Sequence, residues 1–239
     1  MKIISVIGTK DTGKTTLVVK IVEELVNRGF KVGTVKHVHG KFDVEGRDTW
    51  KHKEAGAELV IGSGDETFFL LNQRLELDNI LTMTECMKNI DYLVVEGFKH
   101  SHYAKISVSL LDDEYIIKQV DPFTISDSNL KSLVNLIEER SYSRLPELNC
   151  GECGYDRCKD FAKAMVKGKI TETACVMKKE RSIKLKINGL SVPMNPFVQT
   201  FVRNTTIGML SSLKGDELKD FEGKKIELSI KNGTIGKTY

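Results

Sequence analysis

The sequence lacks the features that would assign it to a membrane or to nucleic acid. None of its apolar runs reaches the roughly 20 residues that a helix needs to span a bilayer. Its 36 basic and 33 acidic residues leave a formal net charge of only +3, which does not indicate an anionic partner. It also has no internal repeat and no low-complexity tract. We therefore expect a cytoplasmic protein with no membrane span and no nucleic-acid partner.

The composition allows one full-sized hydrophobic core. Of the 239 residues, 40% are hydrophobic and 29% are charged, which is enough apolar material for one such core and a small satellite domain. The apolar stretch at residues 3–7 is too short for a secretion signal and runs directly into a glycine-containing loop. We interpret this stretch as a first strand.

Residues 1–140 alternate between expected strands and helices. Strands are expected at residues 3–7, 30–36, 59–62, 67–71, 92–95 and 105–111, and helices at 17–25, 47–57, 77–87 and 130–137. The pattern predicts an α/β fold, a mostly parallel sheet covered on both faces, although residues 59–71 can instead form an antiparallel hairpin inside it. Later elements are expected at 158–168 and 197–213 (helices) and at 183–187 and 226–230 (strands). Composition changes divide the chain into domains at 1–140, 141–186 and 187–239, the last a small α+β region.

Residues 8–15 fit the phosphate-binding pattern G-x-x-x-x-G-K-[ST], the P-loop. Such a loop turns successive backbone N–H groups toward a phosphate, and its glycines permit the close approach. Lys14 would reach the β and γ phosphates, and the Thr15 hydroxyl would face Mg²⁺. The candidate nucleotide-binding residues are Gly8, Thr9, Lys10, Asp11, Thr12, Gly13, Lys14, Thr15 and Thr16.

A second acid-bearing motif lies at residues 91–97. Its apolar strand delivers Glu96 at the carboxyl end, where open α/β sheets bind ligands. Glu96 is therefore a candidate to hold Mg²⁺ or to orient a water, and the alternative is a surface carboxylate at a strand end. The sequence has no N-K-x-D motif for reading a base, so these motifs alone do not separate GTP from ATP.

Further segments match one family in order and spacing. They are V-K-H-V-H at 35–39, F-D-V at 42–44, G-R-D-T at 46–49, A-G-A at 55–57 and E-G-F-K at 96–99. With the P-loop, residues 1 to about 110 resemble MobB, the molybdopterin-guanine dinucleotide biosynthesis protein B family. The resemblance implies a P-loop NTPase fold that binds GTP, weak GTPase activity, frequent homodimers and an adapter role. Its implied partner is a molybdopterin nucleotidyltransferase or a molybdoenzyme.

The resemblance also implies residue roles. The candidate catalytic residues are Lys14, Glu96 and Asp48, and Thr15 and Glu96 would bind Mg²⁺. His37, Asp43 and Asp48 would lie on the γ-phosphate side. For His37 and His39 the alternative is a polar pair in a loop.

Four of the five cysteines follow the spacing C-x2-C-x4-C-x16-C: Cys150, Cys153, Cys158 and Cys175. In a reducing compartment this cluster indicates a metal site rather than disulfides. The segment resembles the four-cysteine domain that binds a [4Fe-4S] cluster in corrinoid iron–sulfur proteins. Zinc and unmetallated thiols are the alternatives. The fifth, Cys86, is expected to be a structural reduced thiol.

The leading hypothesis is a GTP-binding adapter for molybdenum or tungsten cofactor assembly that uses GTP, Mg²⁺ and a [4Fe-4S] cluster. The alternative is a redox-coupled P-loop nucleotidase that matures another metalloenzyme. A small-molecule kinase would need a lid, for which the sequence has no signature. Residues 163–186 hold eight basic and two acidic side chains, so they form either a docking face for an anionic partner or a solvated surface.

Overall fold

The computed structural model of the chain describes residues 1–38, 40, 43–87, 89–178, 183, 185–187, 190–212 and 226. It divides into two compact units, Met1–Lys178 and Lys179–Tyr239. The division into three domains stays a prediction.

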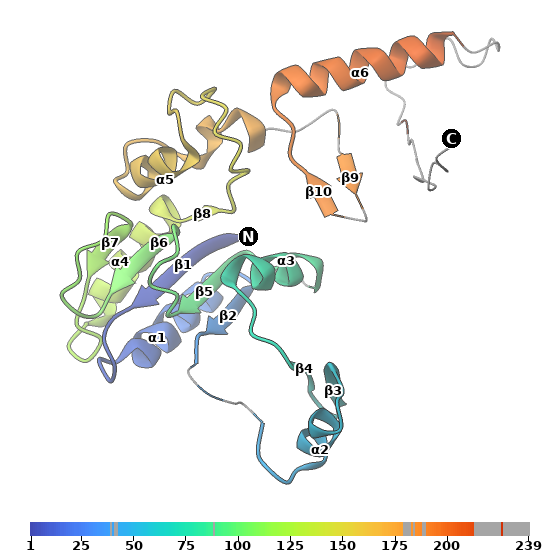
Figure 1. Cartoon of the computed structure of the whole chain (residues 1–239). Coiled ribbons are helices and arrows are strands. Elements are labelled where there is room, and N and C mark those ends of the chain that lie inside the picture. Colours follow the sequence, from blue (N-terminus) through green and yellow to red (C-terminus); the bar gives the residue numbers. More distant parts are fainter. Residues whose placement is uncertain are drawn as a thin grey trace. The chain divides into compact units, whose positions relative to one another are not determined.

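The first unit is built on a six-stranded sheet with the order β2-β5-β1-β6-β7, and β8 pairs with β1 (Figure 1). The strands are β1 (Lys2–Ile7), β2 (Val32–Lys36), β5 (Tyr92–Glu96), β6 (Ala104–Ser107), β7 (Ile116–Gln119) and β8 (Tyr142–Ser143). All pairings are parallel except that of β8. The predicted parallel sheet is confirmed. The strand expected over 105–111 ends at Ser107, and the sequence did not indicate β7 or β8.

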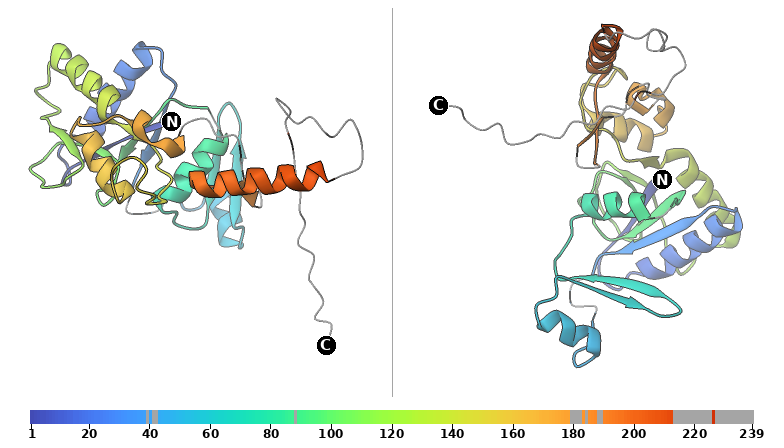
Figure 2. Two further views of the ribbon diagram at one scale, coloured as in Figure 1. Left: turned by 90° about the horizontal axis from the view of Figure 1, so that it is seen from above. Right: turned by 90° about the vertical axis from the view of Figure 1, so that its right-hand side faces the viewer.

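Helices cover both faces of this sheet, as predicted (Figure 2). They are α1 (Lys14–Asn27), α3 (Leu77–Met87) and α4 (Asp127–Arg140). Successive side chains of β1 point to opposite faces, so Ile4 packs with buried residues of α1 and α4, whereas Ile3 packs with Leu77 and Leu81 of α3. Burying each such aliphatic side chain contributes about 1.5–3 kcal/mol.

A glycine ends α1 at the predicted position. Gly29 has φ 86°, and its N–H donates to the Val26 carbonyl at 2.8 Å. The N–H of Phe30 donates to the Leu25 carbonyl at 3.1 Å, which completes a Schellman motif. The chain is thereby turned from α1 into β2.

Residues 48–71 form a separate element group. The helix α2 (Asp48–Glu54) precedes β3 (Leu59–Ser63) and β4 (Thr67–Leu71), which pair antiparallel with each other only. The hairpin alternative is confirmed, but the expectation that these strands lie inside the main sheet is wrong. Phe68 and Phe69 are about half exposed, so this hairpin is not covered on both faces as an interior strand pair would be.

The cysteine-containing segment follows β8 and packs on the core of the same unit. It contains α5 (Cys158–Val166) and two short 3-10 helices, η1 (Glu172–Ala174) and η2 (Val176–Lys178). Phe161 and Met165 of α5 are buried in the same hydrophobic cluster as Ile4 of β1. The helix predicted at 158–168 is confirmed.

The second unit contains a hairpin and a helix. The strands β9 (Leu185–Ile187) and β10 (Leu190–Val192) pair antiparallel, and α6 spans Pro196–Ser211. Asn195 caps α6 by accepting the Val198 N–H at 2.8 Å. The elements expected at 183–187 and 197–213 are confirmed, and the strand expected at 226–230 lies outside the described residues apart from Ile226. No helix in the described part of the chain is long and apolar enough to cross a membrane.

Candidate functional site

The P-loop connects the carboxyl end of the central strand β1 to the start of α1. Gly13 precedes α1 with φ 79°, and no side chain caps the helix there. A Cβ atom at Gly13 would lie 2.5 Å from Pro122 and 2.8 Å from Phe123, and one at Gly8 would lie 2.5 Å from Val108. Both glycines are therefore required by backbone conformation or space. The helix start can offer its N–H groups to an anion.

Three polar side chains meet beside the loop, from α1, β5 and β2. The Thr15 hydroxyl donates to the Glu96 carboxylate at 3.0 and 3.1 Å. Lys36 Nζ lies 3.2 Å from Glu96 Oε1 and 3.0 Å from Thr15 Oγ1. Glu96 is buried, so its charge is balanced by Lys36 rather than by water. A hydroxyl and a carboxylate are oxygen donors of the kind that Mg²⁺ prefers, so this pair fits the predicted metal role.

Lys36 was not singled out from the sequence as a site residue. Its signal was its place at the end of β2, because β2 pairs parallel with β5 and so brings Lys36 beside Glu96 at the carboxyl edge of the sheet. Lys14 donates to the carbonyl of Thr9, within the loop itself. The Thr9 N–H donates to Ser109 Oγ at 3.1 Å, a contact from the end of β6 that no sequence motif indicated.

His37 lies against the carboxyl end of β5. Its ring stacks on Phe98 with centroids 4.6 Å apart, and its Nε2 contacts the guanidinium of Arg74. Gly97 has φ 98°, and a Cβ there would come within 2.9 Å of His37 Cβ. The structure therefore brings His37 to the P-loop edge of the sheet.

Asp43 and Asp48 are placed differently. Asp48 begins α2, pairs with Lys51 at 3.1 Å and is 89% exposed. Asp43 Oδ1 accepts the Thr49 hydroxyl at 3.1 Å. Neither carboxylate is among the described residues that line the cavity beside the P-loop. Their roles at the γ-phosphate stay predictions, and His39 lies outside the described residues.

Two hollows flank the P-loop. A cavity of about 890 Å³ is lined by Gly8, Thr9, Lys10 and Lys14 together with the loop at 97–103. A shallower hollow of about 560 Å³ lies on the other side, between Thr12 and residues 108–110 and 119–123. The two share no lining residue, so the phosphate loop separates two spaces.

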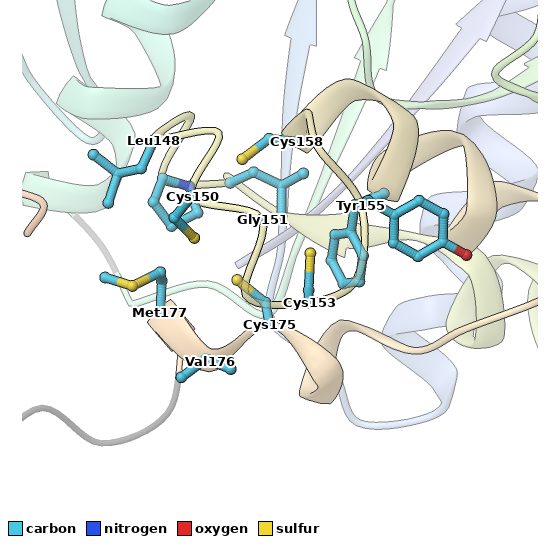
Figure 3. A pocket seen from close by; sticks show the side chains of 12 residues that line it. Leu148, Cys150, Gly151, Cys153, Tyr155, Cys158, Cys175, Val176 and Met177 are labelled. Atoms are coloured by element: carbon cyan, nitrogen blue, oxygen red, sulfur yellow. The ribbon is translucent and has the colours of Figure 1, made fainter. Parts of the chain in front are cut away.

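The four predicted cysteines line one small pocket, and Figure 3 shows their sulfur atoms turned toward a common hollow. Cys158 begins α5, and its N–H donates to Asn149 Oδ1 at 2.9 Å. Burial raises the pKa of the Cys175 thiol, and the backbone N–H groups of Met177 and Lys178 oppose this shift. These N–H groups also suit a metal-bound sulfur. The predicted ligand set is thus brought together.

The same pocket is tightly closed. Its volume is about 10 Å³, room for little more than one water. Within the described residues, no three His, Cys, Asp or Glu side chains converge on a single-ion site. Gly151 and Gly154 have φ 77° and 83°, and a Cβ at either would meet nothing within 4 Å. Open space therefore lies beside these two glycines.

A polar clamp ties the last cysteine to the sheet. Glu172 of η1 accepts the Ser143 N–H at 3.1 Å and forms an ion pair with Lys178 of η2. Lys178 Nζ also donates to the Ser143 carbonyl at 2.8 Å. Cys175 lies between Glu172 and Lys178, so the clamp fixes the segment that carries it to β8.

Comparisons with known proteins match both halves of this site. Residues 3–125 match the family described as "Molybdopterin guanine dinucleotide synthesis protein B", and residues 145–177 match one described as "Putative Fe-S cluster". A Methanocaldococcus jannaschii relative named "Putative molybdopterin-guanine dinucleotide biosynthesis adapter protein" is 34% identical over 225 residues, 90% of this chain and 93% of the relative. The Haemophilus influenzae "Molybdopterin-guanine dinucleotide biosynthesis adapter protein" is 30% identical over 129 residues, 52% of this chain and 72% of the relative.

Solved structures give matches that cover part of the chain. The Bacillus subtilis MobB crystal structure is 21% identical and aligns over 60% of this chain and all of its own, with a TM-score of 0.45. A MobB homologue from Bacillus stearothermophilus is 30% identical over 47% of this chain and 65% of its own, with a TM-score of 0.35.

Proposed function

The chain belongs to the MobB family, and on that premise we propose that it is a GTP-binding adapter in molybdopterin-guanine dinucleotide biosynthesis that carries a [4Fe-4S] cluster. The observation that carries the proposal is the relative named "Putative molybdopterin-guanine dinucleotide biosynthesis adapter protein", which aligns with 90% of this chain. The match of residues 145–177 to the family described as "Putative Fe-S cluster" supports the cluster. The P-loop geometry and the Thr15–Glu96 pair supply the matching chemistry.

The nucleotide would lie across the loop. Its phosphates accept the N–H groups at the start of α1, and Lys14 turns from the Thr9 carbonyl toward them. Thr15 and Glu96 would hold Mg²⁺, which would supply positive charge beside the phosphates. The base enters the hollow beside Thr12, where Leu110 is 89% exposed and Phe123 is 68% exposed. Exposed apolar side chains at a cleft suit the faces of a flat base.

The contacts of the Glu96 carboxylate are consistent with weak hydrolysis of GTP. Its carboxylate is engaged by Lys36 and by the Thr15 hydroxyl, so it serves as a metal-binding group better than as a proton acceptor. Lys36 contacts the Glu96 carboxylate and the Thr15 hydroxyl, the two groups that would hold the metal, so it would give way there to Mg²⁺.

Nucleotide titration tests the first part of the proposal. GTP with Mg²⁺ should bind more tightly than ATP with Mg²⁺, and Lys14→Ala should weaken GTP binding about 100-fold, since a charge-assisted phosphate contact is removed. Lys131→Ala, at an exposed position of α4, is the matched control and should change affinity less than twofold. Equal affinity for both nucleotides, or an unaffected Lys14→Ala variant, would contradict the GTP assignment.

The adapter role is tested by association with a purified molybdopterin nucleotidyltransferase. We expect a complex on size-exclusion chromatography that GTP strengthens, and the same run reports whether the free chain is a homodimer. No complex at micromolar concentrations, with or without GTP, would overturn the adapter role.

The cluster is tested on anaerobically purified protein. We expect the visible absorption of an iron–sulfur cluster with four irons and four sulfides per chain, held by Cys150, Cys153, Cys158 and Cys175. Cys158→Ser should lose this absorption. Cys86→Ser, a substitution at an exposed position of α3, should keep it. Stoichiometric zinc without sulfide would replace the cluster assignment with a zinc site.

One observation favours the second candidate, a redox-coupled nucleotidase that matures another metalloenzyme. Cys158 lines both the cysteine pocket and the cavity beside the P-loop. Under this alternative, GTPase rates should differ between the oxidised and reduced cluster. Identical rates would exclude it.

A further inference from the structure

The cavity beside the P-loop is larger than a phosphate site requires. Its volume is about 890 Å³, and only its near end is made by the P-loop. The far end is built from the start of α3, the loop after β5 and the cysteine segment. The residues contributed there include Arg74, Asp78, Lys99, His102, Tyr142 and Lys159. The hollow that suits a base lies on the other side of the loop, so a bound nucleotide leaves this far end free.

The cavity lining favours an anion. Five cationic side chains (Lys10, Lys14, Arg74, Lys99 and Lys159) and three acidic ones (Glu76, Asp78 and Glu147) line it. Within the described part of the chain, Lys10, Lys99 and Lys159 form no ion pair. Ammonium groups gathered in a concave site without partners attract phosphate more strongly than the same groups on an open surface.

The lining also favours a flat ring. Six ring side chains contribute to it: His37, Phe98, His100, His102, Tyr103 and Tyr142. The ring of Tyr103 lies 6.0 Å from that of Tyr142, which is buried and donates its hydroxyl to the His102 carbonyl, so Tyr142 supports the cavity wall and does not itself face a ligand. Phe98 is fixed by its stack on His37. Aromatic walls that are already ordered stack a planar ligand at little entropic cost.

Lys159 lies at the far end of the cavity and directly follows Cys158, one of the predicted ligands of the cluster. Lys159 and His102 both line this cavity, so α5 and the loop after β5 contribute to the same end of it. The start of α5 is fixed because the Cys158 N–H is bonded to Asn149. The cysteine segment therefore supplies a cationic wall to the P-loop cavity.

We propose that this cavity binds a second small molecule beside the nucleotide, a flat heterocycle that carries a phosphate monoester. The rings stack on the heterocycle, and Lys99 and Lys159 contact its phosphate. The inference deepens the proposed function and rests on it only in assuming that the P-loop holds a nucleotide. A competing source of the phosphate is the nucleotide itself, which the experiment separates.

The test uses the full chain saturated with GDP and Mg²⁺, which fills the P-loop. Flavin mononucleotide is the probe, and riboflavin is its phosphate-free match; stacking quenches the fluorescence of both. We expect the mononucleotide to bind at least tenfold more tightly than riboflavin. Lys159→Ala should weaken it about tenfold, the loss of one charge-assisted contact. Lys159→Arg should restore most of the affinity.

Lys163→Ala is the matched control, since Lys163 lies on the same helix but pairs with Glu114 at 2.5 Å and does not line the cavity. Thermal melts of all variants show whether the fold is intact, and Lys99→Ala provides a second cavity variant away from the cysteines. Four results would overturn the proposal: no binding, equal binding of riboflavin, equal effects of Lys159→Ala and Lys163→Ala, or displacement of GDP by the probe. Loss of GTP preference with intact probe binding would instead refute the proposed function alone.

Discussion

At the scale of single residues, Glu96 is a carboxylate whose burial requires a nearby positive charge. It is buried at the end of β5 and touches both Lys36 and Thr15. The ammonium supplies the positive charge that a buried carboxylate requires. Because Lys36 is about half exposed, it would be able to turn toward solvent if Mg²⁺ took its place, as the proposed function requires.

Replacing Glu96 by Gln keeps the shape of the side chain and removes its charge. We expect the Mg²⁺-dependent gain in GTP affinity to fall about tenfold or more, while affinity measured in chelator changes little, because the carboxylate acts through the metal. Calorimetric titration with and without Mg²⁺ measures both values. Glu23→Gln, exposed on α1, is the control. A Glu96→Gln variant with the full Mg²⁺ effect would remove Glu96 from the metal site.

At the scale of elements, the polar clamp between β8 and the 3-10 helices fixes the position of Cys175. Burial raises the pKa of Glu172, but the hydrogen bonds from Lys178 and Ser143 lower it more, so the net shift is downward. Burial lowers the pKa of Lys178 although Glu172 opposes this. The lowered pKa of Glu172 agrees with the structure, since Ser143 and Lys178 both donate hydrogen bonds to its carboxylate.

Glu172→Gln should therefore destabilise the fold by about 2 kcal/mol at neutral pH, since it leaves Lys178 half-buried without its counter-charge. A carboxyl with a lowered folded pKa contributes stability above its unfolded value, 4.5, and loses it as the pH falls through its folded pKa. Denaturant unfolding from pH 7 downward measures this. The wild type should converge on the variant at acid pH.

The control for the clamp is Glu139→Gln, whose side chain is 61% exposed and lies 3.9 Å from Arg140. Surface pairs of this kind contribute little, so this variant should follow the wild type at every pH. A constant difference between Glu172→Gln and the wild type down to pH 3 would show that the clamp acts through packing and not through charge.

At the scale of the whole molecule, the P-loop and the cysteine segment share one hydrophobic core. Ile4 of β1 and Phe161 of α5 belong to the same buried cluster, within the unit Met1–Lys178. Neither the sheet nor the cysteine segment is expected to be independent, because each buries apolar surface on the other.

A chain ending at Lys178 should consequently fold and bind GTP within twofold of the full chain. A chain ending at Arg140 should melt at a lower temperature, because it exposes the core residues that α5 covers. Thermal melts and nucleotide titration of both chains make the comparison. If the chain ending at Arg140 were as stable as the one ending at Lys178, the shared core would contribute nothing.

Local patterns allowed much of this to be predicted. The helix of residues 17–25 with Gly29 at its end, the strand leading to Glu96 and the helix starting at Cys158 all follow from short-range periodicity and glycine chemistry. The P-loop pattern also predicted which end of the sheet carries the site. The hairpin at 59–71 was placed wrongly in the main sheet, because alternation along a strand does not reveal its pairing partner.

The sequence by itself determined the P-loop, the cysteine spacing and the helices α1, α3, α4 and α5, because each depends on neighbours a few residues apart. Only the tertiary structure decided that Lys36 pairs with Glu96, that Glu172 clamps Ser143, and that Lys159 lines the cavity of the P-loop. These contacts join residues far apart in the chain. Parallel pairing and packing on a common core bring them together, and no local pattern records which distant segments will meet.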